Sequence, residues 1–96
     1  MALAAAGNVR IIDNRRFELI DSVWTDARVT SNTRTVRVKP YSKLYFDLMT
    51  RIDDLSKPFS LGDRVVVGGR AVAIALDPRG LESMDNSALQ ALLRDW

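Results

Sequence analysis

The sequence contains neither cysteine nor histidine. Without cysteine the chain can form no disulfide, no thiol nucleophile and no Cys-based zinc site. Without histidine, nucleophiles activated by an imidazole and His-ligated metals are excluded within the chain. What remains for chemistry is carboxylates, hydroxyls and cations, and the redox compartment stays undetermined.

Long apolar runs are also missing, since no stretch approaches the roughly 20 residues that a membrane span requires. The opening MALAAAG has no basic region and too short an apolar stretch for a signal peptide. We therefore expect no membrane insertion, and we expect residues 1–8 to form a flexible tail or linker in a piece of a larger protein.

With 96 residues there is room for one core. We place this core in a single α+β domain at 9–78, followed by a helical segment at 79–96.

The carboxylates show no catalytic pattern. Asp53 and Asp54 are adjacent, but neighbours on a helix point about 100° apart and cannot share a proton. Four other aspartates lie at expected turns, where backbone hydrogen bonding accounts for them: Asp13, Asp21, Asp63 and Asp77. No loop has calcium-ligand spacing. We therefore predict no enzyme, and no catalytic, cofactor-binding or metal residues.

The charge balance is nearly even, with 14 basic against 12 acidic residues and a net charge of +2. One stretch is locally basic, and its cations are Arg28, Arg34, Arg37 and Lys39. Such a stripe can protect a sheet edge and keep the chain soluble, or it can contact an anionic partner. We expect no specific nucleic acid binding from so few cations.

Alternating apolar residues predict strands at 9–12, 16–20, 23–29 and 35–39. Asp13-Asn14 and Asp21-Ser22 supply the first two turns. A two-residue turn at 21–22 places Leu19 opposite Trp24, so Trp24 is the expected core anchor of this sheet. In the fourth strand Val36 and Val38 point inward, and Thr35, Arg37 and Lys39 point outward.

A helix is predicted over 42–55, because Leu44, Leu48, Ile52 and Leu55 recur at helical spacing behind the N-cap Ser42. It must stop before Pro58. The aromatic residues Tyr41, Tyr45 and Phe46 are interpreted as core rather than as a binding box.

Strands at 64–67 and 70–76 follow, joined by a hairpin turn at Gly68-Gly69. Valines and Ile74 occupy one face of this hairpin. The other face is shallow, and its residues are Val66, Ala71, Ala73 and Ala75.

The last segment is predicted to form an amphipathic helix with a strongly apolar stripe. Its anchors are Leu89, Leu92, Leu93 and Trp96. They are the expected contact surface, either within the fold, with the alanine face as the candidate groove, or with a protein partner or a second copy in a homodimer.

Together these elements predict an α+β fold. It comprises a small, curved, antiparallel sheet or partly open barrel of about six strands, one amphipathic helix before the last hairpin, and a C-terminal helix. An oligonucleotide-binding barrel is the alternative, because it also places a helix before a final hairpin.

The pattern Phe17-x-Leu19-x-Asp21-x-Val23-Trp24-x-Asp26, with its continuations at 35–46 and 61–74, resembles the C-terminal region of bacterial proteins that carry a vault/inter-alpha-trypsin (VIT) domain and a von Willebrand factor type A domain. Ser22 stands where the turn of that pattern has glycine. The Asp-x-Ser-x-Ser metal motif of the type A domain is absent. The resemblance implies an appended accessory module, periplasmic or cell-surface, and it carries over no functional residue.

We therefore expect a non-enzymatic accessory or protein-interaction module without a cofactor. The alternative is a small barrel that contacts nucleic acid through Arg28, Arg34, Arg37 and Lys39.

Overall fold

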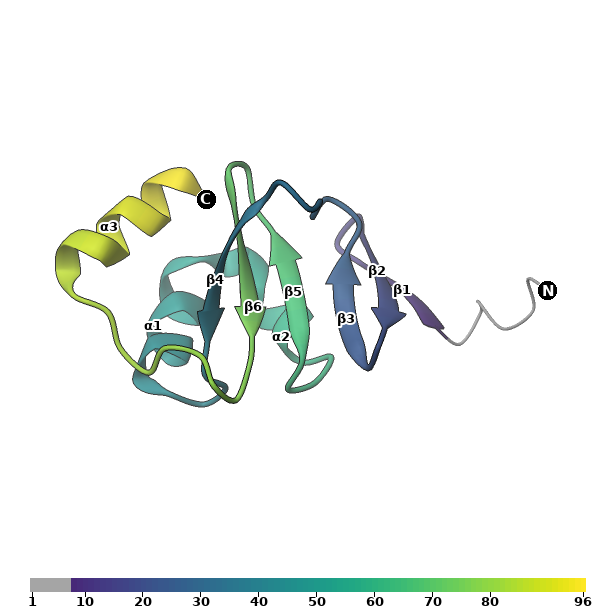
Figure 1. The fold of residues 1–96 in the computed structure, drawn as a ribbon, viewed down its shortest axis with the longest axis horizontal. Helices are drawn as coiled ribbons and strands as arrows, with labels where there is room; N and C mark the ends of the chain where they lie inside the picture. Colours follow the sequence, from purple (N-terminus) through teal and green to yellow (C-terminus); the bar gives the residue numbers. More distant parts are fainter. Residues whose placement is uncertain (1–7) are drawn as a thin grey trace.

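A computed structural model describes residues 8–96. Figure 1 shows the strands standing side by side, helices behind them and a further helix at the C-terminal end. The strands are β1 (Val9–Ile12), β2 (Arg15–Ile20), β3 (Val23–Asp26), β4 (Arg34–Val38), β5 (Val65–Gly68) and β6 (Val72–Leu76). The helices are α1 (Lys43–Arg51), the 3-10 turn η2 (Asp53–Leu55), α2 (Ser56–Phe59) and α3 (Asn86–Asp95).

The strands form one open sheet in the order β1-β2-β3-β5-β6-β4. The α+β class, the six strands and the C-terminal helix are confirmed. The sheet is mixed rather than wholly antiparallel, because β3 pairs with β5 and β4 pairs with β6 in parallel. These parallel pairs arise because the helical segment returns the chain beside β3, and β6 then inserts between β5 and β4 (Figure 1).

The first two hairpins have the turns that the sequence predicts. Asp13 and Asn14 have φ of 50° and 68°, and Asp21 and Ser22 have the same pair of values. Positive φ at both central residues defines the turn whose twist matches that of the flanking strands. Ser22 therefore adopts a backbone conformation that glycine takes more easily.

Helices α1 and α2 pack behind one face of the sheet, α3 lies beyond its β4 edge (Figure 1), and residues of α1, α3 and the sheet share one buried core. Its fully buried side chains include Phe17, Val38, Leu44, Leu48, Leu55, Val65, Val67, Val72 and Ile74. The opposite face is crossed by the 27–33 loop between β3 and β4 (Figure 1). Ile11 and Ile20 lie on that opposite face and are 64% and 50% exposed.

The predicted helix over 42–55 is interrupted. Ser42 caps α1 as expected, because its side chain accepts a hydrogen bond from the Tyr45 amide. The α-helix ends at Arg51, and Ile52 is extended with ψ of 100°. The chain then continues through η2 into α2, which contains Pro58 in its first turn, where proline is tolerated. Ile52 and Leu55 remain buried despite the break.

The predicted turn at Gly68-Gly69 was wrong. Gly68 pairs with Ala73, and the Gly69 amide donates to the Val72 carbonyl over 2.8 Å, so Arg70 and Ala71 form the turn. The register differs from the prediction by an even number of residues, so every side chain keeps its predicted face. Gly69 has another reason to be glycine, because a Cβ there would lie 2.6 Å from the Trp96 ring.

The C-terminal helix α3 packs on its own chain. Leu89 and Leu92 are buried in the main core, and Leu93 and Trp96 are packed against it. The β5–β6 turn caps the end of the helix, because the Arg70 and Ala71 amides donate to the Trp96 and Asp95 carbonyls over 2.8 and 3.0 Å. Residues 79–96 are therefore part of the same folded unit as 9–78.

The alanine face is not the groove that receives this helix. Leu89 and Leu92 join the cluster that contains Val72 and Ile74, on the valine side of the hairpin. The valine side offers larger side chains and hence more buried apolar area. Ala73 is nonetheless fully buried and Ala75 nearly so, whereas Ala71 is exposed in the turn.

Trp24 lies opposite Leu19, as predicted, but it is only partly buried. The reason is its position in β3, near the end of the sheet that the helices do not cover (Figure 1). The Arg10 guanidinium covers the indole from 5.7 Å above the ring centroid. Trp24 is therefore a core-edge residue rather than a central anchor, and Phe17 is the fully buried aromatic residue of this region.

Candidate functional site

The four residues of the predicted basic stripe do not form one surface. Arg34 shares the face of Val72 and pairs with Asp95 on α3, over 2.8 Å. Arg37 points to the opposite face of β4, and Lys39 lies 3.6 Å from Glu82. Arg28 follows β3, where its Cβ lies near Gly68. Arg34 therefore lies on the opposite face of β4 from Arg37, whereas the nucleic-acid alternative used all four residues as one stripe.

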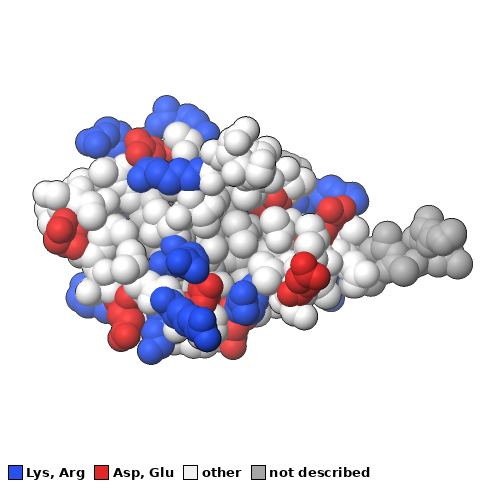
Figure 2. All heavy atoms as spheres, viewed as in Figure 1, with Lys and Arg blue, Asp and Glu red and all other residues white. Residues whose placement is uncertain are grey.

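A different group of cations does converge. Arg37 on β4, Arg64 just before β5 and Arg79 just after β6 line one cavity of about 330 Å³ together with Asp77 and Pro78. We call the three residues the arginine cluster. They meet because β4 and β6 end, and β5 begins, at the same end of the strands (Figure 1). Figure 2 shows several basic side chains there, with acidic ones among them.

The arginine cluster has more positive than negative charge. Its one carboxylate, Asp77, lies 3.9 Å from the Arg37 guanidinium, and its other oxygen accepts a hydrogen bond from the Arg79 amide over 2.8 Å. Among residues 8–96, Arg64 and Arg79 have no carboxylate within 4.0 Å. Three guanidinium groups therefore face one carboxylate, which favours an anionic ligand.

Beside this cluster, β4 has a partly free outer edge. The short segment after β6 pairs with the end of the strand: the Leu81 amide donates to the Arg37 carbonyl over 2.9 Å, and the Lys39 amide donates to the Leu81 carbonyl over 2.8 Å. Gly80 permits this approach, since a Cβ there would lie 2.6 Å from the Val38 backbone.

Backbone groups of alternate residues point to the two sides of a strand. The Arg37 carbonyl and the Lys39 amide bond to Leu81, on the side of β4 away from β6. The backbone amides of Thr35 and Arg37 and the Thr35 carbonyl therefore also point away from β6. Among residues 8–96, β4 is an edge strand next to β6, and no backbone hydrogen bond outside the strand ladders reaches these three groups. The first half of β4 therefore presents a strand edge that can accept another extended segment.

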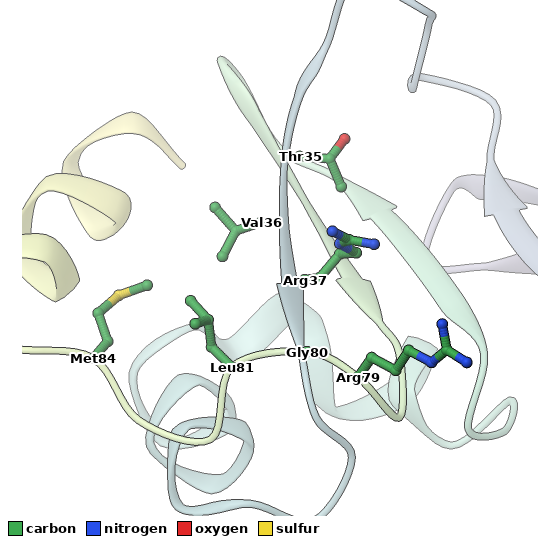
Figure 3. A pocket seen from close by; sticks show the side chains of 7 residues that line it. All are labelled: Thr35, Val36, Arg37, Arg79, Gly80, Leu81 and Met84. Carbon is green, nitrogen blue, oxygen red and sulfur yellow. The ribbon is translucent and has the colours of Figure 1, made fainter.

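A second cavity of about 330 Å³ opens along this edge. Figure 3 shows its lining: Val36 points to one side of β4, towards Leu81 and Met84, whereas Thr35 and Arg37 point to the other side, with Arg79. Leu81 is 49% exposed although it is a large apolar residue. We call the free backbone of Thr35 and Arg37 with this lining the β4 edge site.

A second exposed feature is aromatic. Tyr45 is buried and stacks on Phe59, as expected for core, but Tyr41 is 64% and Phe46 is 51% exposed. The Tyr41 hydroxyl donates to Asp63 over 2.9 Å, and this hydrogen bond raises the pKa of Tyr41 above its usual 10. Burial raises the pKa of Tyr45 as well. These contacts hold the β4–α1 corner, where Tyr41 has an unusual φ of 64°.

The most buried polar group is an ion pair that the sequence reasoning missed. Arg15 donates to Asp26 over 2.9 Å and to the Gly68 carbonyl, and its guanidinium lies 5.9 Å from the Trp96 ring centroid. Asp26 also accepts from the Gly68 and Arg28 amides over 2.9 and 3.0 Å. Arg15 also donates to Asp54 in η2 over 3.1 Å, so the network joins β2, β3, β5 and η2. Every buried side-chain polar atom in the described residues has a partner, which leaves no buried group for a ligand.

Residues 8–96 contain no group of three or more carboxylates placed to hold a metal ion. No helix among them has the length and apolar character needed to cross a membrane. A comparison of the chain with models of protein families, with curated protein sequences and with solved structures finds no match.

Proposed function

We propose that this chain is a non-enzymatic accessory module that binds a protein partner by adding an extended segment to its sheet. The observation that carries the proposal is the β4 edge site, where unpaired backbone groups of Thr35 and Arg37 lie along a cavity of about 330 Å³. Binding of a peptide strand to a sheet edge takes affinity from the backbone and specificity from pockets for alternate side chains. The lack of cysteine and histidine supports a binding role over a catalytic one.

A module of this kind agrees with the resemblance to the C-terminal region of proteins with VIT and von Willebrand factor type A domains. The residues that carry the resemblance form hairpin turns, strands and core, as in a compact appended unit. We propose on this basis that the chain serves a larger bacterial protein of that type, periplasmic or cell-surface, as its accessory domain.

The α3 anchors Leu89, Leu92, Leu93 and Trp96 remain the alternative contact for a partner or a second copy. In the monomer they pack on the chain's own core. Their use by a partner would require α3 to undock, whereas the β4 edge site is accessible without any rearrangement. For this reason we place the interaction at β4.

Selection of binders from a random peptide library tests the proposal. We expect selected peptides to shift the amide resonances of Thr35, Arg37 and Met84 in the intact chain. A matched variant is Thr35→Pro, which removes one outward amide while the pairing with β6 uses the alternate residues. Peptides should lose binding to this variant at unchanged melting temperature. The proposal would be refuted if the selected peptides instead shifted amide resonances of β1 or α3. It would also be refuted if the library yielded no binder.

A further inference from the structure

The two sides of β4 at the edge site differ in character. On one side Val36, Leu81 and Met84 offer aliphatic contacts, and on the other side Arg37 and Arg79 offer positive charge. A strand added to this edge would place its successive side chains alternately on these two sides. The site would therefore select peptides by the alternation of apolar and acidic side chains along the strand, and not by one side chain in a single pocket.

From this geometry we infer that the ligand of the β4 edge site is an extended acidic peptide segment in which aspartate or glutamate alternates with aliphatic residues. The inference rests on the proposed function and specifies its ligand. The aliphatic side chains pack against Val36 and Leu81, and the carboxylates lie against Arg37 and Arg79.

Charge complementarity supports an acidic occupant. Arg79 and Arg64 have no carboxylate partner among residues 8–96, and the guanidinium of Arg37 is 68% exposed with its nearest carboxylate 3.9 Å away. Guanidinium groups bind carboxylates with two parallel hydrogen bonds, an arrangement that a 3.9 Å contact to Asp77 does not fulfil. The arginine cluster thus has donors available for an incoming carboxylate.

A peptide accounts for the site better than a nucleic acid does. Single-stranded nucleic acids bind through a charged groove together with aromatic side chains on which the bases stack. The cavities at β4 are lined by apolar residues, three arginines, one threonine and one aspartate, without an aromatic side chain. The free amides and carbonyl of the strand edge are of use to another backbone in extended conformation.

The experiment uses fluorescein-labelled seven-residue peptides and the intact chain, with binding followed by fluorescence polarisation. One peptide alternates aspartate with valine, a second replaces aspartate by asparagine and a third by lysine. We expect the aspartate peptide to bind about tenfold or more tightly than the asparagine peptide at low salt, with the difference reduced at about 500 mM salt. The lysine peptide should bind most weakly.

Two protein variants locate the charge effect. Arg79→Gln should weaken the aspartate peptide about three- to tenfold and leave the asparagine peptide unchanged, since an exposed charge contributes modestly. The matched control is Arg51→Gln, an exposed arginine on α1 that lines neither cavity. It should change neither affinity. Two further aspartate peptides are N-methylated, one at the central valine and one at the next aspartate. One of the two should lose binding and the other should not, because only alternate amides of an added strand can donate to the Thr35 carbonyl.

The outcomes separate the two proposals. Equal binding of the aspartate and asparagine peptides, both sensitive to Thr35→Pro, would overturn the acidic ligand and leave the strand-edge function standing. No binding of any peptide would overturn both. A labelled single-stranded DNA heptamer that binds more tightly than the aspartate peptide, with loss in Arg79→Gln, would assign the site to nucleic acid instead.

Discussion

At the scale of single residues, the most buried charged group is the ion pair of Arg15 and Asp26. Asp26 is almost fully buried and accepts hydrogen bonds from Arg15, Gly68 and Arg28. Without Asp26, the buried Arg15 guanidinium would keep only the exposed carboxylate of Asp54, 3.1 Å away, and the loss is more costly than that of a surface pair. Asp26 therefore stabilises the junction of β2, β3 and β5.

Asp26→Ala should lower the free energy of unfolding by about 3–5 kcal/mol. The matched control is Glu18→Ala on the neighbouring strand, whose ion pair with Arg16 is half exposed and should contribute less than about 1 kcal/mol. Urea denaturation followed by circular dichroism measures both. Similar losses for the two variants would show that the buried network has no special role.

At the scale of elements, α3 completes the core and is itself capped by the β5–β6 turn. Leu89 and Leu92 are buried, the Trp96 ring lies against Gly69, and Arg34 pairs with Asp95. Burial of each leucine is worth roughly 1.5–3 kcal/mol. The helix therefore contributes a large share of the stability of so small a domain.

Truncation after Gly80 should lower the melting temperature by more than about 10 °C, since about 1 kcal/mol corresponds to 4–8 °C in a domain of this size. The milder Leu92→Ala should cost about 2–4 kcal/mol and serves if the truncated chain does not fold. Light scattering on both proteins measures their mass. An unchanged melting temperature after truncation would contradict the docking of α3. If the parent chain were a dimer through α3, truncation would roughly halve the measured mass, far more than the loss of 16 residues accounts for.

At the scale of the whole molecule, local patterns in the sequence predicted the elements and their faces. Alternation placed Val38 inward and Arg37 outward, and the turn at Asp21-Ser22 fixed the pairing of Leu19 with Trp24. The order of strands in the sheet was not predictable in this way, because the insertion of β6 between β5 and β4 involves contacts far apart in the chain.

The candidate site depends on that long-range order. Arg37 was named from the sequence, but Arg64 and Arg79 lie in separate turns and meet Arg37 only in the folded sheet. The sequence predicts a turn at Asp77, but nothing local shows that Gly80 brings the chain against β4. The Arg15–Asp26 pair was missed for the same reason, although the register of β2 with β3 already placed Asp26 beside Phe17 on the buried face.

Amide hydrogen exchange along β4 is the most direct test of the central claim that this strand has a free edge beside the arginine cluster. The account predicts fast exchange at Thr35 and Arg37, whose amides point outward without a partner in the described residues. It predicts slow exchange at Val36 and Val38, whose amides point towards β6. Lys39 should also exchange slowly, because its amide donates to the Leu81 carbonyl over 2.8 Å. Slow exchange at Thr35 and Arg37, equal to that of Val36 and Val38, would mean that the edge is already covered and would contradict the account.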